Sequence, residues 1–183
     1  MRSSLSWVPR RRWRHPARLL VAVTLLGAVA PVAGAGPAGA AGGDRVSVVA
    51  GFYPLAWAAA EVGGNRVVVR NLTPAGTEPH DLELTTDQRD EIEDADLVLV
   101  LGRGFQPAVE DAAAARRSGT VALLRRLPAD RGPGRGDPHV WLDPVLMRAI
   151  VEEVAAALTR VDPAGEATYV RNAATVTADL DAL

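Results

Sequence analysis

The sequence contains 183 residues, 48% of them hydrophobic and 23% charged, which is typical of a globular domain. Residues 1–40 contain six arginines and no acidic residue, so the net charge of −2 leaves −8 on the remainder. This charge argues against nucleic acid as a partner. Because the sequence contains no cysteine, we expect neither disulfides nor a lipid anchor on an N-terminal cysteine.

The first 40 residues are predicted to be a signal peptide and leader. A basic stretch ends at Arg18, and an apolar run, LLVAVTLLGAVA, follows it. A tract of small residues then contains Ala38 and Ala40. These are the three parts of a secretory signal peptide, so we expect cleavage after Ala40 and export to the periplasm or the extracellular face. An uncleaved membrane anchor is the alternative, although the apolar run is short for a bilayer span.

From about residue 44 the pattern alternates between strands and helices. Buried strands are predicted at 46–51, 66–72, 96–102 and 120–124, and the helices between them at 54–63, 86–95 and 106–119. Thr85 and Gln88 have the spacing of a capping box at the start of the second helix. Strands that alternate with helices predict an α/β fold with a parallel-rich sheet flanked by helices.

Two Asp-Pro pairs are predicted to open the last two helices. Asp143 precedes the segment 144–161, and Asp162 precedes a segment that runs to the final residue. Aspartate is favoured at the N-cap and proline at the first helical position. Before Asp143, residues 125–138 contain too much proline and glycine for regular structure and are predicted to form a loop. We therefore expect one domain over residues 44–183.

Two histidines follow predicted strands, each directly after a proline in a polar turn. His80 lies in TPAGTEPHDLELT and His139 in GRGDPHVWLDP. Imidazole binds zinc and other first-row divalent ions, and the loops beyond the carboxyl ends of parallel strands form ligand crevices. Both residues are therefore candidate metal ligands. The alternative for each is a solvated or capping histidine.

Carboxylates and tryptophans near these histidines have candidate supporting roles. Four acidic residues flank the histidines and could complete or orient a metal site, or act as turn caps: Glu78, Asp81, Asp137 and Asp143. For Asp143 the helix N-cap is the preferred role. Trp57 is expected in the core, and Trp141 is expected to pack beneath the His139 loop and fix its imidazole.

The segments PAGTEPHDLELT, ADLVLVLG and DPHVWLDP resemble the signature segments of the zinc and manganese ABC-transporter solute-binding proteins, the ZnuA-like receptors. The similarity runs from about Val46 to the end of the sequence and covers the family's N-terminal lobe and the start of its connecting helix. The resemblance implies that His80 and His139 bind Zn²⁺ or Mn²⁺. It also implies delivery of the metal to an ABC permease, without enzymatic chemistry.

The resemblance further implies a second lobe that supplies a third ligand and usually a fourth. The sequence ends first, so we expect a truncated form with half a metal site. The last helix is then expected to leave apolar residues such as Val170 and Val176 exposed, which favours dimers or aggregates. Residues 127–136 also contain no histidine, so they do not form the histidine-rich loop of many zinc-specific relatives.

Two other functions remain open from the sequence alone. One is a secreted metal-dependent hydrolase that uses the same histidines with Asp137 or Glu78 as general base. The sequence has no H-E-x-x-H motif to support this reading. The other is a truncated copy that no longer functions in transport.

Overall fold

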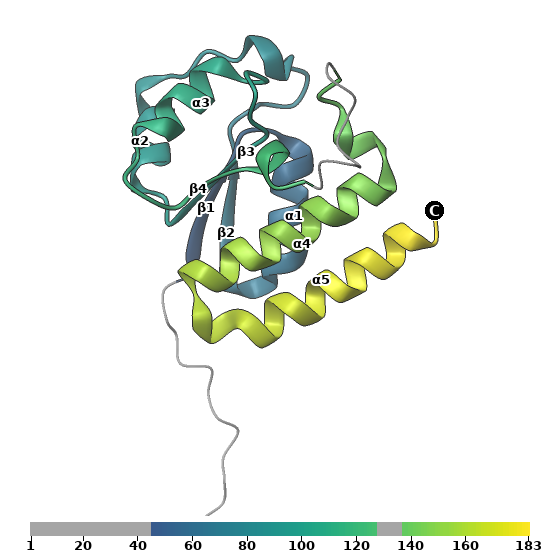
Figure 1. Ribbon diagram of the computed structural model, residues 1–183. Coiled ribbons are helices and arrows are strands. Elements are labelled where there is room, and N and C mark those ends of the chain that lie inside the picture. The colour runs from purple at the N-terminus through teal and green to yellow at the C-terminus, as the bar shows by residue number, and fades with distance from the viewer. Residues whose placement is uncertain (1–44, 128–136) are drawn as a thin grey trace, which may run out of the picture. The chain divides into compact units, whose positions relative to one another are not determined.

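A parallel sheet forms the centre of the computed structural model, which describes residues 45–127 and 137–183 (Figure 1). Within these residues the strand order is β2-β1-β3-β4, and every pair of neighbours is parallel. The strands are β1 (Val46–Ala50), β2 (Val67–Asn71), β3 (Leu97–Val100) and β4 (Thr120–Ala122). The predicted strands are therefore confirmed, each slightly shorter than expected. The predicted signal peptide lies outside the described residues.

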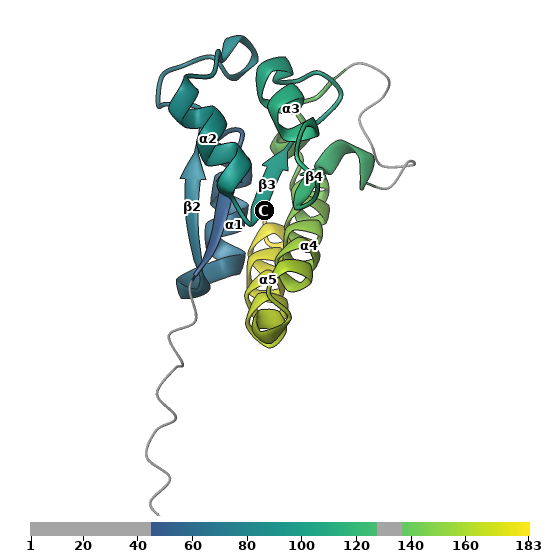
Figure 2. The ribbon, with the colours of Figure 1, turned by 90° about the vertical axis from the view of Figure 1, so that its left-hand side faces the viewer.

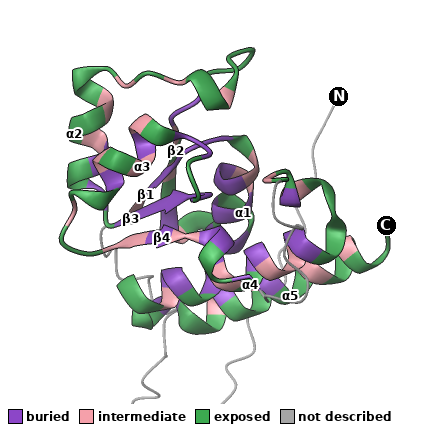
Figure 3. Cartoon of the chain, turned by 45° about the horizontal axis from the view of Figure 1, so that its top comes forward, coloured by how far each residue is buried: buried purple, intermediate pink, exposed green. Residues whose placement is uncertain are grey.

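Helices cover both faces of the sheet (Figure 2). One face carries α1 (Tyr53–Gly63), α4 (Pro144–Val161) and α5 (Glu166–Asp181), and the other carries α2 (Thr86–Asp94) and α3 (Pro107–Ala114). Successive side chains of a strand point to opposite faces, so Val48 packs with the first set of helices and Val49 with the second. Burial on both faces explains why β3 is wholly apolar and β1 nearly so, whereas the edge strand β2 is more exposed and contains Arg70 and Asn71 (Figure 3).

The predicted helix starts are confirmed except for the last. Thr85 and Gln88 form the capping box of α2, and the Asp143 carboxylate accepts hydrogen bonds from backbone N–H groups in the first turn of α4. The prediction that Asp162 caps the last helix is wrong. A 3-10 turn intervenes, and the Asp162 carboxylate instead accepts hydrogen bonds from Arg66 and Tyr169. The bond from Arg66 joins two opposite charges, which a neutral backbone N–H group cannot do.

The last helix exposes less apolar surface than predicted. Val170 is 57% exposed, as expected, but Val176 is only 8% exposed because α5 packs along α1 and α4 and buries that position in the main core. Trp57 is half-buried and packs against the same core, in agreement with its predicted role. No helix among the described residues is long and apolar enough to cross a membrane.

The strand order reverses at the centre of the sheet, between β1 and β3. The chain moves from β1 outward to β2, then crosses back so that β3 pairs with the other side of β1. The loops that follow β1 and β3 therefore lead to opposite faces of the sheet. Ligands in open α/β sheets bind at this reversal of strand order, beyond the carboxyl ends of the strands.

Candidate metal centre

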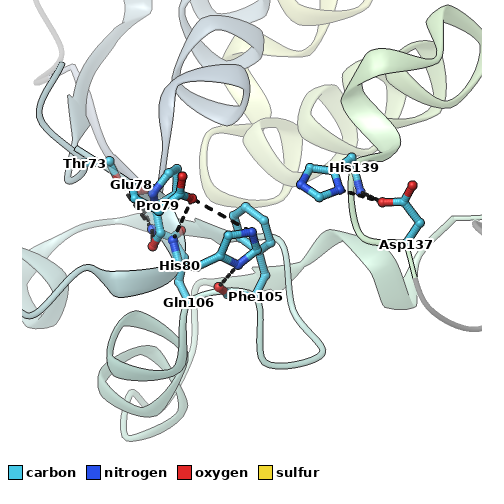
Figure 4. A network of polar contacts seen from close by, with 9 residues as sticks. Thr73, Glu78, Pro79, His80, Phe105, Gln106, Asp137 and His139 are labelled. Carbon is cyan, nitrogen blue, oxygen red and sulfur yellow. Dashed lines mark hydrogen bonds and ion pairs between the residues drawn. The ribbon is translucent and has the colours of Figure 1, made fainter. Parts of the chain in front are cut away.

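His80 belongs to the loop that follows β2, in a 3-10 turn over Pro79–Asp81. Its imidazole packs edge-on against Phe105, with ring centroids 4.3 Å apart. The His80 Nδ1 atom lies 3.1 Å from the Phe105 carbonyl oxygen (Figure 4). Because a carbonyl oxygen can only accept a hydrogen bond, Nδ1 carries the proton and donates it. The neutral ring then has its lone pair on Nε2, where a metal ion can bind.

His139 is oriented in the same way by a carboxylate. Its Nδ1 atom lies 2.6 Å from Asp137 Oδ1, and its backbone N–H donates to the same oxygen at 2.9 Å. These two hydrogen bonds hold the pKa of Asp137 below its ordinary value, and the bond from the backbone N–H has the larger effect. An ionised carboxylate only accepts, so Nδ1 of His139 is also the donor and Nε2 carries the lone pair. A carboxylate on the far nitrogen is a common way to orient a metal-binding histidine.

The two imidazoles lie side by side, although His80 follows β2 and His139 follows β4, which are the two edge strands of the sheet. Their ring centroids are 5.9 Å apart and their planes are inclined by 74°. Metal–nitrogen bonds of about 2.1 Å place the centroids of two imidazoles on one ion roughly 5–6 Å apart. Both side chains are close to half exposed. The structure therefore brings the two predicted residues together in a pair that a metal ion can join, with one side open to solvent.

Three aromatic rings support the pair. Trp141 lies 5.1 Å from His139 between ring centroids and also contacts Phe52 and Phe105. Phe52 and Phe105 are buried, so the imidazoles rest on a floor that is part of the core. Trp141 was expected beneath the His139 loop, and the structure confirms this position. Phe105 was not predicted from the sequence to belong to the site, although its position just after the third strand could have indicated this role.

The remaining carboxylates do not complete a metal site. Asp143 is engaged as the N-cap of α4. Glu78 Oε1 lies 4.0 Å from His80 Nε2 and accepts a hydrogen bond from the His80 backbone N–H. Within residues 45–127 and 137–183, no group of three or more histidine, aspartate or glutamate side chains is arranged to hold a metal ion. The two imidazoles are therefore the candidate ligands in the described part of the chain.

Comparison with protein families identifies the chain. The family model described as zinc-uptake complex component A, periplasmic, matches residues 48–183. The manganese-binding lipoprotein MntA of Halalkalibacterium halodurans is 30% identical over 145 residues, which are 77% of this chain and 48% of that protein. The iron-binding protein YfeA of Yersinia pestis is 31% identical over 135 residues, covering 70% of this chain and 43% of that protein.

Solved structures agree with the sequence comparisons. The metal-dependent lipoprotein YcdH from Bacillus subtilis is similar with a TM-score of 0.68 and 28% identity. The Zn(II)-bound ZnuA-like domain of Streptococcus pneumoniae AdcA has a TM-score of 0.66 and 29% identity. Each match covers 75% of this chain and 52% of the solved chain, so the chain spans about half the length of the relatives that it matches. It belongs to the ZnuA-like family of metal-binding solute receptors.

Proposed function

We propose that this chain captures Zn²⁺ or Mn²⁺ through the Nε2 atoms of His80 and His139. The observation that carries the proposal is the pair of imidazoles 5.9 Å apart, each with its Nδ1 atom engaged by a hydrogen-bond acceptor. This arrangement fixes both rings and leaves the metal-binding nitrogen of each free. Because the ligands are already ordered before the metal ion binds, their ordering does not weaken metal affinity. The names of the relatives refer to manganese, iron and zinc, which are all first-row metals.

The proposed role is uptake rather than catalysis. Its support is membership of a family of transport receptors, so the metal ion is cargo that is passed to an ABC permease. The hydrolase alternative needs a free general base. Asp137 instead accepts two hydrogen bonds from His139, which favours an orienting role for this carboxylate.

The proposed location is outside the cytoplasm. The family description is periplasmic, and the N-terminal pattern in the sequence is that of an export signal. The manganese-binding relative is a lipoprotein, so the comparisons give no support to the expectation that this chain lacks a lipid anchor.

Titration calorimetry with Zn²⁺ and with Mn²⁺ tests the proposal. The parent chain from residue 41 onward is compared with the double variant His80→Ala/His139→Ala. We expect one saturable site in the parent and no site in the double variant. The experiment also ranks the two metals.

Two outcomes would contradict the proposal. One is metal binding that survives in the double variant. The other is the absence of binding in the parent, even after a second lobe from a relative has been joined to its C-terminus. The second version is informative because two imidazoles bind a metal ion far more weakly than a complete set of four ligands.

A further inference from the structure

The side chain of Gln106 connects the loops that follow three strands. Gln106 is 2% exposed and is the residue that precedes α3. Its Nε2 group lies 3.1 Å from the Gly51 carbonyl oxygen, 3.1 Å from Thr73 Oγ1 and 3.2 Å from the Pro79 carbonyl oxygen. Gly51 follows β1, and Thr73 and Pro79 follow β2. One buried amide therefore lies at the reversal of strand order and joins three segments (Figure 4).

The same amide bears directly on His80. Its acceptor, the Pro79 carbonyl, belongs to the peptide bond between Pro79 and His80. The residue before Gln106 is Phe105, whose carbonyl accepts the hydrogen bond from His80 Nδ1. Two adjacent residues of the β3–α3 loop thus contact the His80 turn at two points, one on its backbone and one on its ring. The hydrogen bond from the Gln106 side chain to the Pro79 carbonyl therefore holds the His80 turn close to the Phe105 carbonyl, which selects the His80 tautomer.

The orientation of the Gln106 amide is determined by its acceptors. A flipped amide would place Oε1 against the carbonyl oxygens of Gly51 and Pro79, which cannot donate a hydrogen bond. In the orientation observed, Oε1 is buried and has no hydrogen-bond partner among the described residues. Buried polar atoms without a partner are rare in proteins and destabilise the fold. The orientation that leaves Gln106 Oε1 unpaired is therefore the one in which the Nε2 group donates to the Gly51 and Pro79 carbonyls.

We propose that Gln106 is a positioning residue for metal binding. It holds the Pro79–His80 peptide where the Phe105 carbonyl can fix the proton on Nδ1, which keeps Nε2 available for the metal ion. This inference rests on the proposed function.

Two measurements on Gln106→Ala test the inference. The metal-free protein is studied by ¹⁵N NMR of the imidazoles at a pH where they are neutral, and metal affinity is measured by calorimetry. We expect the single Nδ1–H tautomer of His80 to become a mixture, and the affinity for Zn²⁺ to fall by roughly 10–100-fold. The matched control is Gln88→Ala. Its amide also donates to a backbone carbonyl after β2, that of Leu72, and its other hydrogen bonds go to Thr85 and not to the His80 turn. The control should retain both the tautomer and the affinity.

A second variant moves the same amide without altering Gln106. A Cβ atom on Gly51 would lie 2.3 Å from Gln106 Oε1, so Gly51→Ala should displace the amide and reproduce both effects. In the Gln106→Ala background that contact is absent, and Gly51→Ala should then have no further effect on affinity. This comparison separates positioning from a general loss of stability.

The outcomes distinguish this inference from the proposed function. If Gln106→Ala and Gly51→Ala fold and both keep the parent's His80 tautomer, the positioning role is wrong, whatever the metal affinity. If the tautomer changes as expected but affinity does not, Gln106 orients His80 without serving metal binding, and the inference also fails. If no form of the chain binds metal, the proposed function fails and the tautomer still reports whether Gln106 positions His80.

Discussion

Tyr169→Phe is expected to destabilise the chain by removing one buried hydrogen bond. Tyr169 is 0% exposed, and its hydroxyl donates to Asp162 Oδ2 at 2.6 Å. Arg66 Nη2 donates to the same oxygen at 2.7 Å, and the Asp162 side chain is 17% exposed. Together these groups join the start of β2, the end of α4 and the body of α5. The substitution leaves the packing of the ring unchanged and deletes only the hydroxyl.

The size of the effect follows from the partners. A hydrogen bond to a charged group contributes about 1.5–3 kcal/mol. Arg66 still pairs with the carboxylate in the variant, so we expect a loss in the lower half of this range, about 1.5–2 kcal/mol. For a domain of this size that corresponds to a decrease in Tm of roughly 5–7 °C.

The loss should depend on pH. The hydrogen bond from the Tyr169 hydroxyl is the largest influence on the pKa of Asp162 in the folded state and lowers it; with the smaller contributions of Arg66 it outweighs burial, which raises this pKa. A carboxyl group with a lowered folded-state pKa contributes stability above its unfolded pKa of about 3.9 and loses it as the pH falls through the folded value. The difference between parent and Tyr169→Phe should therefore be complete at neutral pH and shrink in acid.

Urea unfolding at neutral pH and in acid measures both quantities. The matched control is Tyr53→Phe, because Tyr53 is 68% exposed and its hydroxyl should contribute little. The reasoning is refuted if Tyr169→Phe is no less stable than Tyr53→Phe at neutral pH, or if its loss of stability is the same in acid.

Two further predictions concern the site and a helix start. Asp137→Ala removes the acceptor of His139 Nδ1, so metal affinity should fall by roughly 10–100-fold in calorimetry. The unfolding curve should stay close to that of the parent, since the Asp137 side chain is 73% exposed. An unchanged affinity would count against the orienting role of Asp137. Thr85→Ala removes the hydroxyl that accepts from the Gln88 N–H at the start of α2, and should destabilise the chain by about 1 kcal/mol in urea unfolding. No change would mean that the capping box contributes nothing here.

Much of the fold could be predicted because its signals are local. The apolar segments that became β1 and β3 are buried on both faces, so their sequences contain few polar residues. Thr85 and Asp143 lie within three residues of the N–H groups that they cap. Local signals do not predict the role of Asp162. Its partners, Arg66 and Tyr169, lie outside the capping motif, so no short sequence pattern identifies them.

The sequence by itself determined the fold class, the family resemblance and the identity of the two candidate ligands, His80 and His139. These depend on residue types and short spacings. Only the tertiary structure decided that the two imidazoles lie 5.9 Å apart, which nitrogen of each is engaged by an acceptor, and that the Gln106 amide donates to the Pro79 carbonyl beside His80. The physical reason is that parallel strands bring the loops at their carboxyl ends together from distant parts of the chain. The contacts made there depend on strand order and not on neighbours in sequence.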